Sequence, residues 1–197
     1  MNKMKPKEME GAKLCAPASF CVNRELKVFW SKKSDAHEDI IEEFDLHVDG
    51  VREANFVRVE VVPPKEGAFE TPPDQWVFKL DQENAPSWYD KDKTEKACRI
   101  ALVDWAAAKL ALSGQVKTIK AGVLYACGSS AVTAYNKSTV IACDKSTVRE
   151  IIGGCVRFFC KFSVKISGKM SVAIDMTGDK AICHVGEDEP RVVTGGK

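Results

Sequence analysis

Few residues of this 197-residue chain have the types and spacing that catalysis requires. His37 lies in an acidic run at residues 35–39 and could act as a general acid or base, but a solvent-exposed helix position is the simpler interpretation. His184 follows Cys183, yet adjacent residues on a strand point to opposite faces, which separates a thiol from its base. Glycine-rich phosphate-binding and His-Glu-x-x-His patterns do not occur. We therefore expect no catalytic residues and no enzymatic activity.

Eight cysteines could in principle bind metal or form disulfides. Cys15 with Cys21, and Cys155 with Cys160, come nearest to ligand spacing, but no Cys-x-x-Cys pair occurs. The basic N-terminal residues lack the apolar stretch of a signal peptide. We expect free thiols, no metal, no cofactor and a cytoplasmic location. No apolar run approaches the roughly 18 residues of a membrane span, so no membrane contact is expected.

An eight-residue repeat organises the second half of the chain. The segment NKSTV at residues 136–140 returns as DKSTV at residues 144–148. Turn-forming residues such as Gly128 and Gly168 recur in another slot of the repeat. One position of the repeat, which we call the aliphatic slot, holds an aliphatic residue seven times in a row. These residues are Leu124, Val132, Val140, Val148, Val156, Val164 and Val172. Alternation of this kind is typical of β-strands.

Two all-strand architectures can hold such a repeat. In an antiparallel β-meander with two-residue hairpins, Val132 and Val140 would lie on opposite faces, which gives no single core. In a β-solenoid each repeat forms one side of a coil, and all of these valines point inward. The sequence therefore predicts an α+β N-terminal domain followed by a short β-solenoid with 16-residue coils. The antiparallel β-meander is the alternative.

The chain divides into four predicted parts. Residues 1–22 form an N-terminal extension, residues 23–115 an α+β domain, residues 116–185 the solenoid and residues 186–197 a polar tail. A helix over residues 93–112 closes the α+β domain, and its Ile100, Leu110 and Leu112 are expected to cap the first coil. The short polar tail caps the last coil poorly, so this edge could pair with a second copy in a homodimer.

Alternate residues of the repeat face outward on two walls of the predicted solenoid. One wall is unusually apolar, which leaves two interpretations: another part of the chain covers it, or it binds a partner. The predicted partner-binding residues are Tyr125, Ile141, Arg157 and Phe159 on the apolar wall, and Tyr135 and Arg149 on the other.

The charge of the chain is unevenly distributed. Residues 116–185 contain ten Lys and Arg against four Asp and Glu, a net charge of +6 within a chain of net charge +1. Lysines recur near the predicted turns and form the predicted basic edge of Lys137, Lys145, Lys161 and Lys169, in which 137 with 145 and 161 with 169 would line two edges. Few aromatic residues accompany them, so we expect at most weak, non-specific nucleic-acid binding.

The segments SDAHEDIIEEF, NFVRVEVVPP, WVFKLD and PSWYD, followed by short repeats, resemble small proteins of phages and prophages. The resemblance covers about residues 24–185 and carries no settled activity. It implies the cytoplasm of an infected or lysogenic bacterium. The expected function is a non-enzymatic binding protein that contacts a host protein or ribonucleoprotein, such as an inhibitor of a CRISPR-type or other defence complex. Nucleic-acid or ribonucleoprotein binding through the basic solenoid, and a structural role in the virion, are the alternatives.

Overall fold

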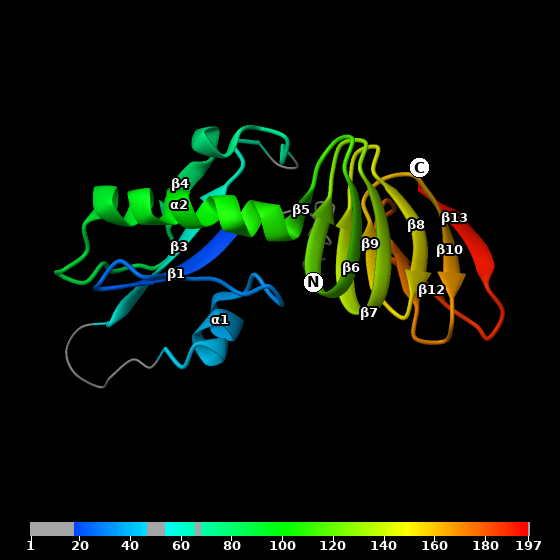
Figure 1. Cartoon of the computed structure of the whole chain (residues 1–197), viewed down its shortest axis with the longest axis horizontal. Helices are drawn as coiled ribbons and strands as arrows, with labels where there is room; N and C mark the ends of the chain where they lie inside the picture. The colour runs from blue at the N-terminus through cyan, green and yellow to red at the C-terminus, as the bar shows by residue number, and fades with distance from the viewer. Residues whose placement is uncertain (1–17, 47–53, 66–67, 197) are drawn as a thin grey trace, which may run out of the picture.

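The computed structural model describes residues 18–46, 54–65 and 68–196 of the chain. They form two units that lie side by side (Figure 1). The first unit holds a four-stranded sheet and two α-helices, and the second is a β-solenoid. Cys15 and His47 lie outside the described residues.

The sheet of the first unit is antiparallel, with strand order β2-β1-β3-β4. Its strands are β1 (Ala18–Asn23), β2 (Val28–Phe29), β3 (Phe56–Val62) and β4 (Val77–Leu80). Strand β1 lies inside the range predicted to be an N-terminal extension. It pairs with β2 on one edge and β3 on the other, and its side chains are almost all buried because both faces of the sheet are covered. The predicted boundary at residue 22 therefore cuts a strand of the sheet.

A helix covers each face of this sheet. Helix α2 (Lys91–Lys109) packs Cys98, Leu102 and Trp105 against the alternating valines of β3, and a short 3-10 turn, η1 (Pro73–Gln75), precedes β4. Helix α1 (His37–Glu43) covers the opposite face, where Ile40 packs on β1 and β3. Of the three residues expected to cap the first coil, Ile100 does not, since it is 68% exposed. Leu110 is buried in β5 (Leu110–Ala111), which pairs with the first long strand of the solenoid, and Leu112 packs against the same core.

The second unit is a β-solenoid of about four turns over residues 110–175. Parallel strands of successive coils pair 16 residues apart, as Leu124 does with Val140 and Val140 with Val156. This confirms the predicted solenoid, and the parallel pairing excludes the antiparallel meander. The strands are β5 (Leu110–Ala111), β6 (Val116–Ala126), β7 (Ala131–Ala142), β8 (Thr147–Ile152), β9 (Cys155–Phe158), β10 (Phe162–Ser167) and β11 (Val172–Asp175).

The strands form two walls around one apolar core. Wall 1 consists of β5, residues 123–126 of β6, residues 139–142 of β7, β9, β11 and β12 (Ile182–Val185). Wall 2 consists of residues 116–119 of β6, residues 131–135 of β7, β8, β10 and β13 (Arg191–Gly195). The aliphatic slot from Leu124 to Val164 points into the core, where each of its six side chains is buried.

Two irregularities change which residues point inward. A shift of register in β8 turns Glu150 outward and places Ile151 in the core, where the eight-residue slot would have put Glu150. The last coil is one residue longer, since Val156 pairs with Ala173. Ala173 is therefore buried, whereas Val172 is half-buried and Met170 is 79% exposed, so the expected inward position of Val172 is wrong.

The C-terminal residues complete both walls. Strand β12 adds antiparallel to β11, and β13 adds antiparallel to β10. The predicted polar tail at residues 186–197 therefore contains a strand of the sheet, whose Val193 is buried against the core. The edges of the last parallel strands are covered within the chain, so a homodimer through the C-terminal edge, which stays a prediction, would have to use β12 or β13.

Candidate functional site

The first unit covers one half of wall 1. Tyr125, Cys127 and Cys143 point outward from the solenoid and are 0–5% exposed, because they share a core with aromatic residues of the first unit. Phe69 stacks on the Tyr125 ring with 5.5 Å between centroids, and Trp105 lies at 6.2 Å from the same ring. This half of the apolar wall is therefore an intramolecular interface.

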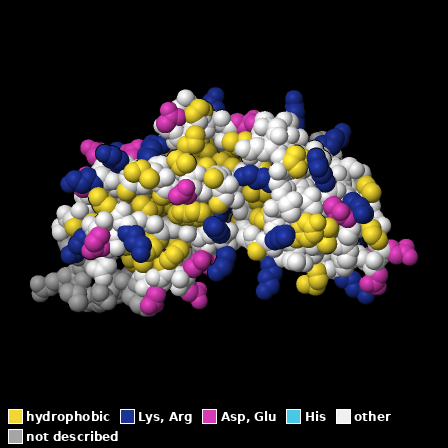
Figure 2. Space-filling view, in the orientation of Figure 1, with side chains coloured by type: hydrophobic (Ala, Val, Ile, Leu, Met, Phe, Trp, Pro, Cys, Tyr) yellow, Lys and Arg dark blue, Asp and Glu magenta, His cyan; other side chains and the backbone are white. Residues whose placement is uncertain are grey.

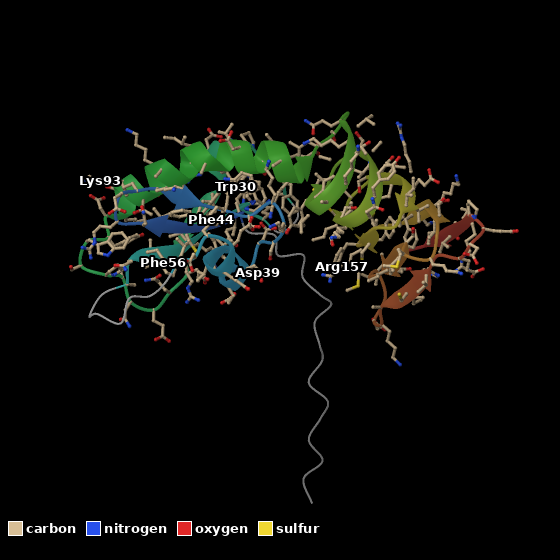
Figure 3. All side chains as sticks on the ribbon, turned by 60° about the horizontal axis from the view of Figure 1, so that its bottom comes forward. Trp30, Asp39, Phe44, Phe56, Lys93 and Arg157 are labelled. Atoms are coloured by element: carbon tan, nitrogen blue, oxygen red, sulfur yellow. The ribbon has the colours of Figure 1, made fainter. Side chains whose placement is uncertain are left out.

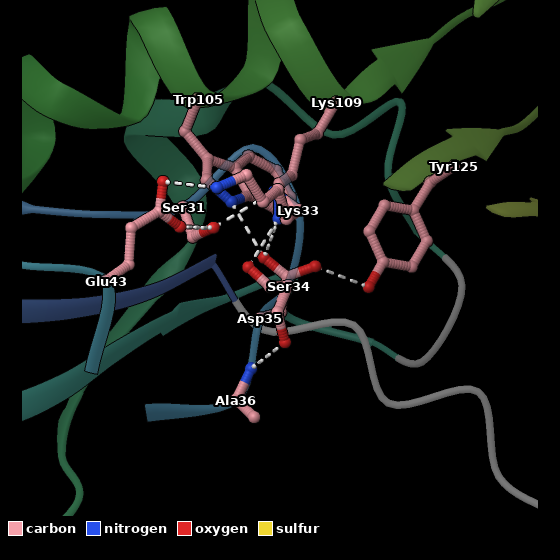
Figure 4. A network of polar contacts seen from close by, with 9 residues as sticks. All are labelled: Ser31, Lys33, Ser34, Asp35, Ala36, Glu43, Trp105, Lys109 and Tyr125. Carbon is pink, nitrogen blue, oxygen red and sulfur yellow. Dashed lines mark hydrogen bonds and ion pairs between the residues drawn. The ribbon is translucent and has the colours of Figure 1, made fainter. Parts of the chain in front are cut away.

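Asp35 fixes this interface with charged and polar contacts (Figure 4). The ammonium group of Lys109, whose side chain is 1% exposed, donates to Asp35 Oδ1 at 2.6 Å. Trp105 Nε1 donates to the same oxygen at 3.2 Å, and the Tyr125 hydroxyl donates to Oδ2 at 2.9 Å. Burial lowers the pKa of Lys109, and the Asp35 carboxylate opposes this shift. One carboxylate thus ties helix α2 to strand β6.

A close backbone approach completes the interface. Val123 donates its backbone N–H to the Lys32 carbonyl at 3.1 Å. The preceding Gly122 has a φ of 87°, and a Cβ atom at this position would lie 2.3 Å from the Lys32 oxygen. Only glycine allows both the left-handed conformation and this approach. The segment before α1 is therefore locked onto wall 1.

The other half of wall 1 is uncovered by the described residues, and Arg157 lies at its centre. Arg157 is exposed and pairs with Ile141 on one side and Ile174 on the other. Figure 3 shows Arg157 on the underside of the solenoid, on the side where it meets the first unit. We call this surface the Arg157 face, and it consists of Ile141, Cys155, Arg157, Phe159, Val172, Ile174, Cys183 and Val185.

The Arg157 face combines a cation with apolar surroundings. Val185 is 50% exposed, and the side chains of Cys155, Val172 and Ile174 are half-buried. Arg157 forms no ion pair among the residues that the structure describes. Burial raises the pKa of the Cys155 thiol, although Arg157 lowers it, so this thiol is neutral near physiological pH. The chemistry available here is recognition of an anionic and apolar surface.

The six predicted partner-binding residues do not share one surface. Tyr125 is buried at the interface between the units, and Ile141 lies at its border, whereas Arg157 and Phe159 belong to the Arg157 face. Tyr135 and Arg149 lie on wall 2, across the core from the other four. One half of the apolar wall is thus covered within the chain, as the first interpretation predicts, and partner binding by the other half stays a prediction.

The four predicted basic-edge lysines divide between two opposite corners of the coil. Residues stack when they are 16 apart, so lysines that are eight apart lie on opposite sides of a coil. Lys137 and Lys169 therefore follow wall 2, whereas Lys145 and Lys161 follow wall 1. Lys169 is also paired with Asp188 at 2.8 Å. Figure 2 shows Lys and Arg side chains scattered over the visible face instead of gathered along one edge. The lysines thus line two edges, but the expected pairs 137/145 and 161/169 are replaced by 137/169 and 145/161.

One group of side chains has the composition of a metal site. Single donor atoms of His37, Glu60 and Asp81 lie within 4.8 Å of one another. His37 is 5% exposed, so the expected solvent-exposed position is wrong. Burial of this polar ring is compensated by a hydrogen bond between Nε2 and the Val59 carbonyl oxygen at 3.1 Å. Sequence spacing gave no signal for this group, since its members are more than 20 residues apart along the chain from α1 to β3 and β4.

No protein-family profile, curated protein or solved structure matches this chain. Within the described residues, no helix is long and apolar enough to cross a membrane.

Proposed function

We propose that the protein is a non-enzymatic binding protein whose Arg157 face docks onto an acidic and apolar surface of another protein. The observation that carries this proposal is the exposed Arg157 side chain, which lacks an ion-pair partner among the described residues and is flanked by Ile141 and Ile174. Arginine within an apolar surround is typical of the residues that dominate binding energy at protein interfaces.

The rigidity of the site supports the same function. Arg157 lies in the middle of β9, which pairs with β7 on one side and β11 on the other. A strand that is paired on both sides presents its side chains with little loss of backbone entropy on binding. Since the resemblance to phage and prophage proteins implies a bacterial host, we propose a host protein or ribonucleoprotein of a defence system as the partner, in the bacterial cytoplasm.

Affinity capture from a bacterial lysate, with and without nuclease, tests this function. The panel contains the wild-type protein, Arg157→Glu on the Arg157 face and Arg149→Glu as a matched control on wall 2. We expect a protein partner that the wild type and Arg149→Glu capture equally. Arg157→Glu should weaken binding by about 2 kcal/mol or more, which is roughly thirtyfold.

Two results would contradict the proposal. Equal capture by Arg157→Glu and the wild type would show that the Arg157 face is not the binding surface. A partner that nuclease removes would instead favour the nucleic-acid alternative, whose lysines the fold divides between two corners.

A further inference from the structure

His37, Glu60 and Asp81 come from three different elements of the first unit. His37 is the first residue of α1, Glu60 lies inside β3, and Asp81 directly follows β4. The backbone N–H of Asp81 donates to the Arg58 carbonyl at 2.9 Å, which fixes Asp81 beside β3. The three side chains therefore meet on the face of the sheet that α1 covers.

The hydrogen bond of His37 determines which ring nitrogen faces the carboxylates. A carbonyl oxygen can only accept, so Nε2 must carry the proton that it donates to Val59 O at 3.1 Å. In the neutral ring Nδ1 then has a free lone pair, and it lies 3.2 Å from Asp81 Oδ2. Two acceptors at this distance repel each other unless a positive charge lies between them. Histidines that bind metals commonly have this arrangement, with the second nitrogen donating to a carbonyl.

The charge of the group indicates which cation fits. With both carboxylates ionised and His37 neutral, the three donors carry two negative charges. Lys79, which pairs with Glu60 from β4, offers only one positive charge. A divalent cation bound between the three donors balances both carboxylates by itself, and imidazole with carboxylates is a donor set that Zn²⁺ takes.

We propose that His37 Nδ1, Glu60 and Asp81 bind one divalent transition-metal ion, for which Zn²⁺ is the best-fitting candidate. Metal–ligand bonds of about 2.0–2.2 Å in tetrahedral geometry separate neighbouring ligand atoms by about 3.4 Å. The Nδ1–Oδ2 distance of 3.2 Å is close to that edge. Side-chain rotation of Glu60 brings in the third ligand, and water takes the fourth position. The ion ties α1 to β3 and β4.

Isothermal titration calorimetry with Zn²⁺ on the full-length protein tests this site. We expect one tightly bound ion per chain. His37→Gln keeps an amide that can donate to Val59 but removes Nδ1, and it should weaken Zn²⁺ binding by about tenfold or more. Asp81→Asn, at a side chain that is 48% exposed, should have a similar effect with little effect on folding. His184→Gln, on β12, is the matched control and should bind as the wild type does.

Co²⁺ absorption spectroscopy separates this site from the cysteines. Co²⁺ in the proposed site should give visible ligand-field bands without a thiolate charge-transfer band. Absence of stoichiometric binding, binding that both His37→Gln and Asp81→Asn retain, or a thiolate band would each overturn the proposal. If His37→Gln fails to fold, Asp81→Asn alone decides between these results.

Discussion

The Asp35 carboxylate stabilises the contact between the two units and does not cap the helix that follows it. Ser34 and Asp35 precede α1 and are residue types that cap helices, but the N-cap is Ala36, and no side chain caps the helix. The Asp35 side chain points away from the N-terminus of α1 and pairs with Lys109, because a buried ammonium group requires a carboxylate partner. The electrostatic demand of a buried ammonium group outweighs the roughly 1 kcal/mol of a helix cap.

Substitution of Asp35 by Asn should therefore destabilise the protein strongly. The change leaves the Lys109 charge buried without its counterion, which costs about 3–5 kcal/mol. Chemical denaturation measures this loss against Asp39→Asn, an exposed carboxylate on α1 that should cost little. The double variant Asp35→Asn/Lys109→Met should recover much of the stability. If it were no more stable than Asp35→Asn, the buried charge would not be the cause.

Asp175 makes stability depend on pH at the far end of the solenoid. Burial raises the pKa of Asp175, but hydrogen bonds from Thr177 and from the Gly196 backbone lower it below 3.8 overall. Thr177 donates its backbone N–H and hydroxyl to Oδ1 at 2.9 and 2.7 Å, and Gly196 donates to Oδ2 at 2.9 Å. The stabilisation is thus present above pH 3.8 and is lost as pH falls through the lower folded-state value.

We expect Asp175→Asn to lose about 1–3 kcal/mol near neutral pH, because an amide cannot accept at both positions. Urea denaturation at a series of pH values should show the wild type losing stability toward the variant below pH 3.8. The exposed Asp179→Asn serves as control and should follow the wild type throughout. A constant difference between Asp175→Asn and the wild type across acid pH would contradict the assigned role of the carboxylate.

At the scale of elements, the regular part of the repeat is what the sequence predicts best. Val140 and Val156 stack because the regular coils repeat a spacing of 16 residues, so one period predicts both the solenoid and the side chains that point into its core. Glu150 interrupts the slot, and the strand shifts register at this position. The longer last coil has no such marker, since Val172 and Ala173 are both apolar and either can fill the core. The repeat therefore predicts Val172 as the inward residue of the last coil, whereas Ala173 fills this position.

Strand β13 offers a direct test of whether the C-terminal residues belong to the fold. Val193 pairs with Val164 and is 8% exposed, whereas the adjacent Val192 is 66% exposed. Val193→Lys should cost several kcal/mol because it places a charge against the core, and Val192→Lys should cost under about 0.5 kcal/mol. Thermal melting compares the two variants. Equal melting temperatures would show that residues 191–195 behave as a tail.

The contacts between the two units could not be predicted, because their partners are far apart in sequence. Asp35 and Lys109 are 74 residues apart, and Asp35 and Tyr125 are 90 apart. The repeat correctly turns Tyr125 and Arg157 outward, yet only tertiary packing decides which of them is covered. His37, Glu60 and Asp81 likewise meet through the pairing of β3 and β4 with α1 above them. Both candidate sites thus depend on tertiary contacts between elements that are far apart in the sequence.

The residues that the structure describes leave one half of wall 1 uncovered, and the central claim is that this half binds the partner. Site-specific photo-crosslinking tests it most directly, with p-benzoylphenylalanine in place of Ile174 on the Arg157 face or of Tyr135 on wall 2. In a bacterial lysate, we expect the Ile174 position to form one defined crosslink to a protein, and the Tyr135 position to form none to it. A crosslink to the same protein from Tyr135 but not from Ile174 would contradict the account.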